Sequence, residues 1–299
     1  MIERSIFSNL TRATDGNVSA QHGPYLLQSA LQPILRETSE GVFELEAIEG
    51  LVRASRDGVH IPPAELFSLI DEEDQPLVDS LCRSLHILNA GLLGRNDVTL
   101  LINSQPGLFT SPHAIRQEID RMRLAAHEAG MAPARIACEI RERSGDDLAA
   151  LARFAGQLHE AGFLVAIDDY SATDHDLDRL SRLRPDFLKF DPVWMQRFAG
   201  NSAGVALMRV IVAQLEREGV HAIVPSVEAA AQVELCREMG MPLMQGYLLG
   251  RPQIVPTSLN ADFPAIAGGT VRVSPPVSRL ATPANRAPRT APRFGRRIA

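Results

Sequence analysis

The distribution of apolar residues along the chain predicts an α/β fold. From about Tyr25 to Gln253, short continuous apolar runs alternate with longer amphipathic stretches. Continuous runs are typical of strands in a parallel sheet buried on both faces, and repeated alternation with helices favours an α/β architecture. Several of the runs also end in polar residues, which favours a (β/α) barrel because such a barrel assembles its site at the C-terminal strand ends.

The individual elements follow from the same patterns. The apolar runs expected to form strands are VTLLIN (98–103), RIACEI (135–140), FLVAIDD (163–169), DFLKFD (186–191) and HAIVPSVE (221–228). Amphipathic periodicity predicts helices over 113–130, 146–162 and 203–219. Each of these helices ends in glycine, the residue that most readily adopts the left-handed conformation found at helix C-termini.

Length and composition favour one large domain with tails. The chain has 299 residues, of which 45% are apolar and 22% are charged. We expect a lead-in at 1–23, the folded domain at 24–255 and a tail at 256–299. The tail is rich in Pro, Ala and Arg and has few large apolar residues, so it is predicted to be disordered.

Charge, cysteine usage and hydropathy exclude several classes of function. The formal net charge of −6 gives no reason to expect nucleic-acid binding, which needs a basic surface. Cys82, Cys138 and Cys236 lie far apart, so neither a zinc site nor a disulfide framework is indicated, and a reducing cytoplasm fits best. No run approaches the ~18 consecutive apolar residues of a membrane span.

The polar residues at the ends of the predicted strands indicate a metal site. They are Asn103, Glu139, Asp168 with Asp169, Lys189 and Glu228. Such groups are costly inside a barrel wall but are expected at its mouth. Converging carboxylates with an amide suit Mg²⁺ or Mn²⁺ rather than a metal that prefers soft ligands.

Lys189 is a separate signal, because it is the only lysine in a chain whose other basic side chains are arginines. A compact ammonium group has been kept beside the predicted acids. The planar arginine fork is a poor substitute for a point charge beside a metal-bound water or a phosphate oxygen.

Seven short motifs follow one another along the predicted domain. They are LQPI (31–34), EGLVR (49–53), INS (102–104), EIRE (139–142), IDDY (167–170), LKFD (188–191) and MQGYLLGRP (244–252). In these motifs and their order, the chain from about Tyr25 to Gln253 resembles an EAL domain, the family of cyclic-di-GMP phosphodiesterases and their inactive relatives. The resemblance implies a TIM-like (β/α)₈ barrel of EAL type, with one antiparallel strand.

The resemblance also implies roles for individual residues. The matching positions are Glu49, Asn103, Glu139 and Asp168 for a first Mg²⁺ or Mn²⁺, Asp169 for a second, Lys189 near the attacking water, Gln32 and Arg53 for ligand contacts, and Glu228 and Gln245 around the site. In active members, two metals activate water for attack on one phosphodiester, which gives linear pGpG.

The sequence departs from the family pattern in the stretch VPSVE at 224–228, where the family has Ala-Glu-Gly-Val-Glu. Pro225 stands at the position of a glutamate that serves the metal shell and is the proposed general base. Proline can neither accept a proton nor hold a metal-bound water. Loss of a general base typically lowers the rate by ~10²–10⁴-fold, so hydrolysis is expected to be weak or lost.

Three further departures accompany it. The loop SATDHD at 171–176 lacks the family's glycines, so we expect an altered loop shape. Arg141 replaces a threonine, and the sequence suggests that it pairs with Asp174 and Asp176 of that loop. Gly50 replaces the central alanine of the signature, a change expected to matter little.

These observations support three functions. The first is a cytoplasmic domain that binds cyclic-di-GMP with a divalent metal in bacterial second-messenger signalling. The second is an active phosphodiesterase in which Glu228 or Lys189 takes over water activation. The third is a protein-interaction regulator, independent of nucleotide, that acts in motility or biofilm control. A homodimer is compatible with each.

Overall fold

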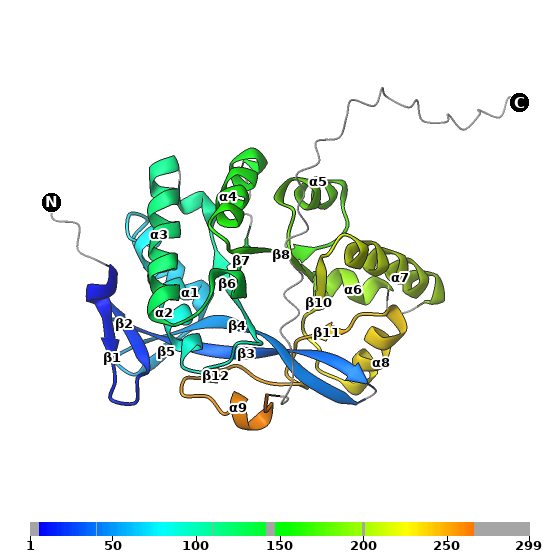
Figure 1. The fold of residues 1–299 in the computed structure, drawn as a ribbon, viewed down its shortest axis with the longest axis horizontal. Coiled ribbons are helices and arrows are strands. Elements are labelled where there is room, and N and C mark those ends of the chain that lie inside the picture. Colours follow the sequence, from blue (N-terminus) through cyan, green and yellow to red (C-terminus); the bar gives the residue numbers. More distant parts are fainter. Residues whose placement is uncertain (1–5, 40, 110, 142–146, 199–200, 266–299) are drawn as a thin grey trace, which may run out of the picture.

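The protein is built around a closed barrel of eight strands (Figure 1). The computed structural model describes residues 6–39, 41–109, 111–141, 147–198 and 201–265. The barrel strands are β3 (Tyr25–Ser39), β4 (Val42–Arg56), β6 (Thr99–Ser104), β7 (Ile136–Ile140), β8 (Leu164–Tyr170), β9 (Phe187–Phe190), β10 (His221–Val224) and β11 (Leu243–Met244). Their order is β3-β11-β10-β9-β8-β7-β6-β4, and β3 pairs with β4 to close the ring.

The strand directions confirm the predicted barrel with one antiparallel strand. Strand β3 is antiparallel to both of its barrel neighbours, β4 and β11. The other neighbouring pairs in the ring are parallel. Parallel strands bring their C-terminal ends to the same mouth of the barrel, which is where the polar residues were expected to meet.

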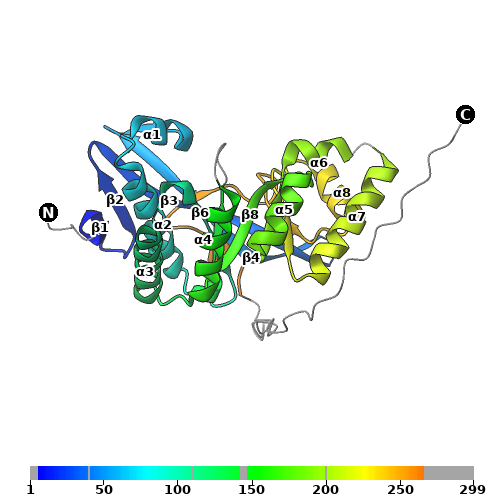
Figure 2. The ribbon, with the colours of Figure 1, turned by 90° about the horizontal axis from the view of Figure 1, so that it is seen from above.

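The helices form the outer layer. They are α1 (Pro63–Leu69), α2 (Gln75–Gly91), α3 (Pro112–Glu128), α4 (Leu148–Glu160), α5 (Asp174–Leu183), α6 (Pro192–Phe198), α7 (Ser202–Arg217), α8 (Ala230–Met239) and α9 (Leu259–Asp262). Figures 1 and 2 show α2, α3 and α4 toward one end of the molecule and α6, α7 and α8 toward the other. Within the described ranges, no helix combines the length and apolar character that crossing a membrane requires.

The three helices predicted from periodicity are confirmed as α3, α4 and α7, each starting at a capping side chain. Ser111 accepts a hydrogen bond from the Ala114 amide, Asp147 from the Ala149 amide and Asn201 from the Gly204 amide. These caps satisfy amide groups that have no partner within the helix, so the local sequence fixes where each helix begins.

Four of the five predicted strands agree closely with β6, β7, β8 and β9, but the fifth is shorter than expected. The run at 221–228 was expected to be a strand, and β10 ends at Val224. The next residue, Pro225, has no amide hydrogen to donate, and Ser226 adopts a φ of 59°. Glu228 therefore lies beyond the strand, just before α8.

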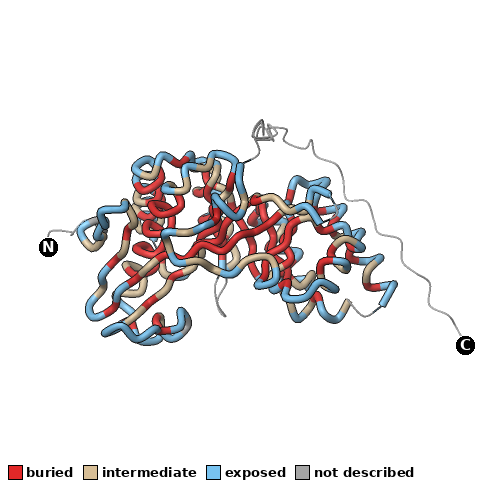
Figure 3. Tube along the Cα trace, turned by 90° about the horizontal axis from the view of Figure 1, so that it is seen from below, coloured by how far each residue is buried: buried red, intermediate tan, exposed pale blue. Residues whose placement is uncertain are grey.

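The core has two layers. One residue from each barrel strand contributes to an interior cluster, which consists of Ile34, Ala47, Leu101, Ala137, Ala166, Phe187, Ile223 and Leu243. A larger cluster fills the space between the strands and the helices. Figure 3 shows buried residues concentrated along the strands. Both faces of the strands are therefore covered, which explains why their apolar runs are continuous.

Both ends of the predicted domain continue into structured chain. Strands β1 (Leu10–Arg12) and β2 (Val18–His22) lie within the expected lead-in, and β2 pairs with β3. After residue 255, helix α9 packs against the domain, with Leu259 buried in the main core. The predicted disorder of the tail concerns residues that, from 266 onward, lie outside the described ranges.

The remaining short elements lie at the periphery of the barrel. Strand β5 (Val59–Ile61) pairs with β4, and strand β12 (Gln253–Ile254) pairs with β3. Three single 3-10 turns occur at η1 (Ile6–Asn9), η2 (Pro106–Leu108) and η3 (Pro133–Arg135). Turn η2 follows β6 directly and so shapes the barrel mouth beside Asn103.

The expectation that glycine at position 50 matters little is wrong, because His86 of α2 packs directly on it. A Cβ atom at Gly50 would lie 2.7 Å from His86 Cγ. The His86 ring is buried, and its Nδ1 is hydrogen bonded to Ser29 Oγ at 2.7 Å. Burial, with the charges of Arg53 and Arg83, lowers the pKa of His86 to about 3, so the ring is neutral at physiological pH.

We predict that Gly50→Ala lowers the free energy of unfolding by about 1–3 kcal/mol, the usual cost of overpacking a core. In a His86→Ala background the same change should cost little, because the clash is gone. Urea denaturation followed by circular dichroism measures both. Gly156→Ala on α4, where an added Cβ meets nothing within 4 Å, is the control and should be neutral or stabilising. An equal cost in both backgrounds would contradict the contact.

Candidate functional site

A ring of polar side chains lies directly above the apolar interior of the barrel. Side chains two positions apart on a strand point to the same face. On each parallel strand, the residue two positions after the interior-cluster residue therefore lies at the mouth. On β3, which runs the other way, the residue two positions before the interior-cluster residue does so. This rule selects Gln32, Glu49, Asn103, Glu139, Asp168, Lys189, Pro225 and Gln245. Seven of these eight positions are polar, and the eighth, directly after the end of β10, is Pro225.

The ammonium group of Lys189 holds the ring together. Its Nζ lies 2.7 Å from Glu139 Oε1 and 3.1 Å from Glu49 Oε2. Two amides complete the surroundings of Glu49: Gln245 Nε2 donates to Oε2 at 2.7 Å and Asn103 Nδ2 donates to Oε1 at 3.4 Å. The structure thus brings together five residues, from β4, β6, β7, β9 and the end of β11.

Burial and mutual charge set the ionisation of this cluster. Burial opposes ionisation of Glu49, but the charge of Lys189 and the hydrogen bonds outweigh it and lower its pKa. For Glu139, burial and then the charges of Glu49 and Asp168 raise the pKa to about 8 despite Lys189. Burial alone would lower the pKa of Lys189, but the surrounding carboxylates raise it above its ordinary value. The lysine is therefore a permanent cation.

The donor set fits a hard divalent cation. Glu139 is fully buried, and within the described ranges its Oε2 has no hydrogen-bond partner. An orphaned carboxylate oxygen, near the carboxylates of Glu49 and Asp168 and the amide of Asn103, is the donor chemistry that Mg²⁺ and Mn²⁺ prefer. In the described part of the chain, no three Asp, Glu, His or Cys side chains are already arranged to enclose an ion. The carboxylates instead face the cationic side chains of Lys189 and Arg141.

Arg141 does not pair with Asp174 and Asp176, as the sequence suggested, but with Asp168. Its Nη2 donates to Asp168 Oδ2 at 3.0 Å. The expectation failed because Asp176 already serves α5, where it accepts hydrogen bonds from the Thr173 amide and hydroxyl. Asp176 also pairs with Arg179. Because the ends of β7 and β8 are neighbours, Asp168 is nearer to Arg141 along the sheet than Asp174 and Asp176 of the loop are.

The backbone is left-handed at two residues near the loop without glycine. Asp169 in β8 and Ala172 in the loop both have a φ of 54°, a region that side chains with a Cβ rarely adopt. Asp169 is exposed at the mouth, and partial loss of hydration together with the charge of Asp168 raises the pKa of its carboxylate. The predicted second-metal residue thus lies beside the ring rather than within it.

Gln32 of the ring and the remaining predicted residues, Arg53 and Glu228, have their hydrogen-bond partners outside the ring. Gln32 Nε2 donates to the Gly250 carbonyl at 3.2 Å, and Arg53 Nη1 donates to the Val52 carbonyl at 3.0 Å. Arg53 follows Glu49 by four residues on β4 and so shares its face. Glu228 is exposed, and in the part of the chain the structure describes its carboxylate makes no hydrogen bond with the cluster.

Sequence reasoning missed a buried ionic cluster beneath the loop that follows Asn103. Arg83 of α2 pairs with Asp79 and with Glu118 of α3 at 2.7 Å, and its guanidinium carbon lies 5.2 Å from the centre of the Phe109 ring. The spacing of Asp79 and Arg83, one helical turn apart, was the available signal. The cluster supports residues 105–109 and hence the position of Asn103.

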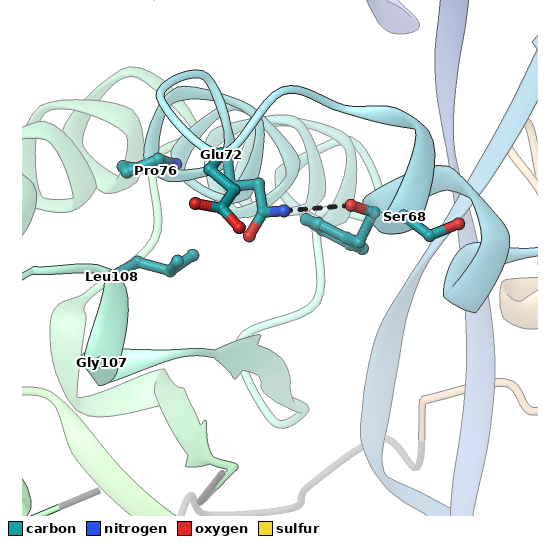
Figure 4. A pocket seen from close by; sticks show the side chains of 7 residues that line it. Ser68, Glu72, Pro76, Gly107 and Leu108 are labelled. Carbon is teal, nitrogen blue, oxygen red and sulfur yellow. Dashed lines mark hydrogen bonds between the residues drawn. The ribbon is translucent and has the colours of Figure 1, made fainter. Parts of the chain in front are cut away.

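A cavity of about 590 Å³ lies next to this loop (Figure 4). Its lining is contributed by α1, the start of α2 and turn η2: Phe67, Ser68, Glu72, Gln75, Pro76, Gly107 and Leu108. The cavity shares no residue with the polar ring, so it is a separate feature of the surface.

We predict that Lys189→Met lowers the free energy of unfolding by about 3–5 kcal/mol at neutral pH in EDTA, because it leaves buried carboxylates uncompensated. The deficit should shrink as the pH falls toward the unfolded-state pKa of a glutamate, about 4.3. In the parent, Lys189 lowers the pKa of Glu49, whereas without Lys189 burial raises that pKa above its unfolded value, so in this range only the folded variant takes up a proton at Glu49.

The control for Lys189→Met is Arg182→Met, which removes an exposed pair with Asp178 on α5. That change should stay within about 0.5 kcal/mol of the parent. Urea titrations at several pH values measure both variants. Equal stability of Lys189→Met and the parent would contradict the central role of the ammonium group.

Comparison with known proteins agrees with the fold. The EAL domain family matches residues 25–252. The chain is 26% identical over 234 residues to the cyclic di-GMP phosphodiesterase NbdA of Pseudomonas aeruginosa, covering 76% of this chain and 29% of NbdA. It is 29% identical over 196 residues to the bifunctional diguanylate cyclase/cyclic di-GMP phosphodiesterase MucR of that organism, covering 65% of this chain and 28% of MucR. The chain thus spans less than a third of either relative.

Solved structures give the same result. The manganese and cyclic-di-GMP complex of BlrP1 from Klebsiella pneumoniae superimposes with a TM-score of 0.65 at 26% identity, covering 76% of this chain and 56% of that one. The calcium and cyclic-di-GMP complex of BlrP1 gives a TM-score of 0.63, also at 26% identity, covering 83% and 60%. With a family match over most of its length, on a barrel that carries the polar ring, this chain belongs to the EAL domain family.

Proposed function

We propose that this domain binds cyclic-di-GMP together with a divalent cation and hydrolyses it slowly or not at all. The observation that carries the proposal is the ring itself: seven strands contribute a polar side chain, and the eighth contributes Pro225. The seven polar side chains suit binding of a cation and a nucleotide. Pro225, the one apolar residue of the ring, lacks the proton acceptor that the reaction would need.

The oxygen donors Glu49, Asn103, Glu139 and Asp168 would hold the cation, Mg²⁺ or Mn²⁺. When bound, such a cation lowers the pKa of its water and neutralises phosphate charge. A second cation beside Asp169 has less support than the first, because the Asp169 carboxylate is exposed outside the ring.

The nucleotide would be held by residues near the mouth. Arg53 lies on the same face of β4 as Glu49, and its guanidinium can give a phosphate two parallel hydrogen bonds. Gln32 on β3 is paired with Glu49 on β4, and Gln245 donates a hydrogen bond to Glu49. Both amides therefore lie beside Glu49. Lys189 keeps its positive charge at working pH and so favours an anionic ligand.

The lesion at Pro225 concerns the chemical step. Proline offers neither a proton acceptor nor a ligand, and Ser226 holds a φ of 59°, a backbone region that suits glycine. In the alternative of an active phosphodiesterase, Glu228 or Lys189 would activate water. Glu228 lies beyond the strand, and Lys189 is already protonated between two carboxylates. Neither is therefore well placed to serve as a base.

The wider role that we propose is bacterial second-messenger signalling in the cytoplasm. Support for the location comes from Cys82, Cys138 and Cys236, which are free and buried in the fold. A homodimer and a protein partner in motility or biofilm regulation remain predictions.

We predict that cyclic-di-GMP binds in the presence of Ca²⁺, with heat measurable by isothermal titration. Arg53→Ala should weaken binding by about tenfold or more, the usual cost of a charge-assisted phosphate contact. The matched control is Arg56→Ala, which removes an exposed arginine three residues along the same strand. The absence of heat at high micromolar nucleotide would refute the proposed function.

We predict that Pro225→Glu combined with Ser226→Gly raises turnover to pGpG by about 10²-fold or more, the typical contribution of a general base. Chromatography of the products with Mn²⁺ present measures this. The control is Pro225→Gln with Ser226→Gly, which has the same shape but no base and should remain slow. If the parent already turns over as fast as the glutamate variant, the protein is an active phosphodiesterase instead.

A further inference from the structure

Arg141 reaches from the end of β7 to a carboxylate of the polar ring. Its backbone amide donates to the Ser104 carbonyl at 3.1 Å, which fixes its main chain against β6. Its Nη2 donates to Asp168 Oδ2 at 3.0 Å. The Arg141 side chain is 56% exposed, whereas that of Asp168 is 9% exposed. A half-exposed cation at the rim is thus paired with a buried carboxylate.

Both oxygens of Asp168 are already engaged. Oδ2 takes the guanidinium, and Oδ1 accepts the Asp169 amide at 2.9 Å. Each carboxylate oxygen has further lone pairs, so a cation could still approach. It would then meet the positive charge of Arg141 at the same carboxylate. Two cations sharing one anion repel each other, and the repulsion falls only if the guanidinium moves away.

The side chain of Arg141 is less enclosed than that of Lys189. Lys189 is buried and lies between Glu49 and Glu139. Arg141 makes a single hydrogen bond to Asp168 rather than a paired fork, from a side chain that is mostly in water. When the contact breaks, water can solvate the exposed guanidinium, and an arriving cation would replace its charge beside the buried carboxylate.

We propose that Arg141 is an internal competitor of the divalent cation: its guanidinium occupies Asp168 in the metal-free protein and must leave when the cation binds. The proposal rests on the proposed function, because it concerns the same site. Its consequence is a metal affinity lower than the oxygen donors alone would give.

The test is Mn²⁺ affinity without nucleotide, measured by the electron paramagnetic resonance signal of free Mn²⁺. Arg141→Thr should bind Mn²⁺ about tenfold more tightly than the parent, since it removes one partly solvated charge beside the ion. Arg141→Lys keeps a charge and should stay near the parent. The matched control is Arg153→Ala, which removes an exposed arginine paired with Asp147 and should change nothing. Asp168→Asn should weaken binding in either background.

The outcomes separate this inference from the proposed function. Tighter Mn²⁺ binding by Arg141→Thr, with Arg153→Ala unchanged, supports the competitor, and it does so even if the parent shows no measurable binding. Unchanged or weaker Mn²⁺ binding by a folded Arg141→Thr variant overturns the competitor. In that case, cyclic-di-GMP binding by the parent would still support the proposed function. If neither the parent nor Arg141→Thr binds millimolar Mn²⁺, both ideas fail.

Discussion

One buried ammonium group makes the mouth of this barrel possible. Glu49 and Glu139 stand on strands that point their side chains into a space from which water is largely excluded. Two such carboxylates without a counter-charge would cost several kcal/mol. Lys189 contacts both, the Gln245 amide shares Glu49 Oε2 with the lysine, and the Asn103 amide donates to Glu49 Oε1. The polar ring is stable because its charges are paired before any ligand arrives.

The same pairing shapes what the site can do. A divalent cation entering the ring must share carboxylates with Lys189 and Arg141, so binding rearranges existing contacts rather than filling a ready cage. Pro225, directly after β10, differs from these carboxylates, because proline has no proton acceptor in any conformation. Recognition and chemistry are therefore separable here: the residues that would hold a nucleotide are independent of the residue whose loss would slow its cleavage.

Local regularities in the sequence predicted the barrel and four ring residues, Asn103, Glu139, Asp168 and Lys189, whereas Gln32, Glu49 and Gln245 came from the motifs shared with EAL domains. Buried parallel strands need continuous apolar runs, and the alternation along a strand fixes which residue follows the interior one. Contacts between distant elements could not be foreseen. His86 packs on Gly50 only because α2 crosses β4, and Arg141 pairs with Asp168 only because the ends of β7 and β8 are adjacent. The helix cap at Thr173, which engages Asp176, was visible in the sequence and would have corrected the pairing expected for Arg141.

The pairing of β2 with β3 bears on how the protein should be handled. Strand β3 carries Gln32 at the mouth, but its first residues lie outside the barrel, where Ala20 pairs with Leu27 and His22 with Tyr25. A shortened chain beginning at residue 24 would strip the partner from this stretch and leave an open edge whose Leu27 side chain is normally fully covered. Open apolar edges recruit strands from other molecules. Such a shortened protein should aggregate, whereas one that starts before Leu10 keeps the edge closed.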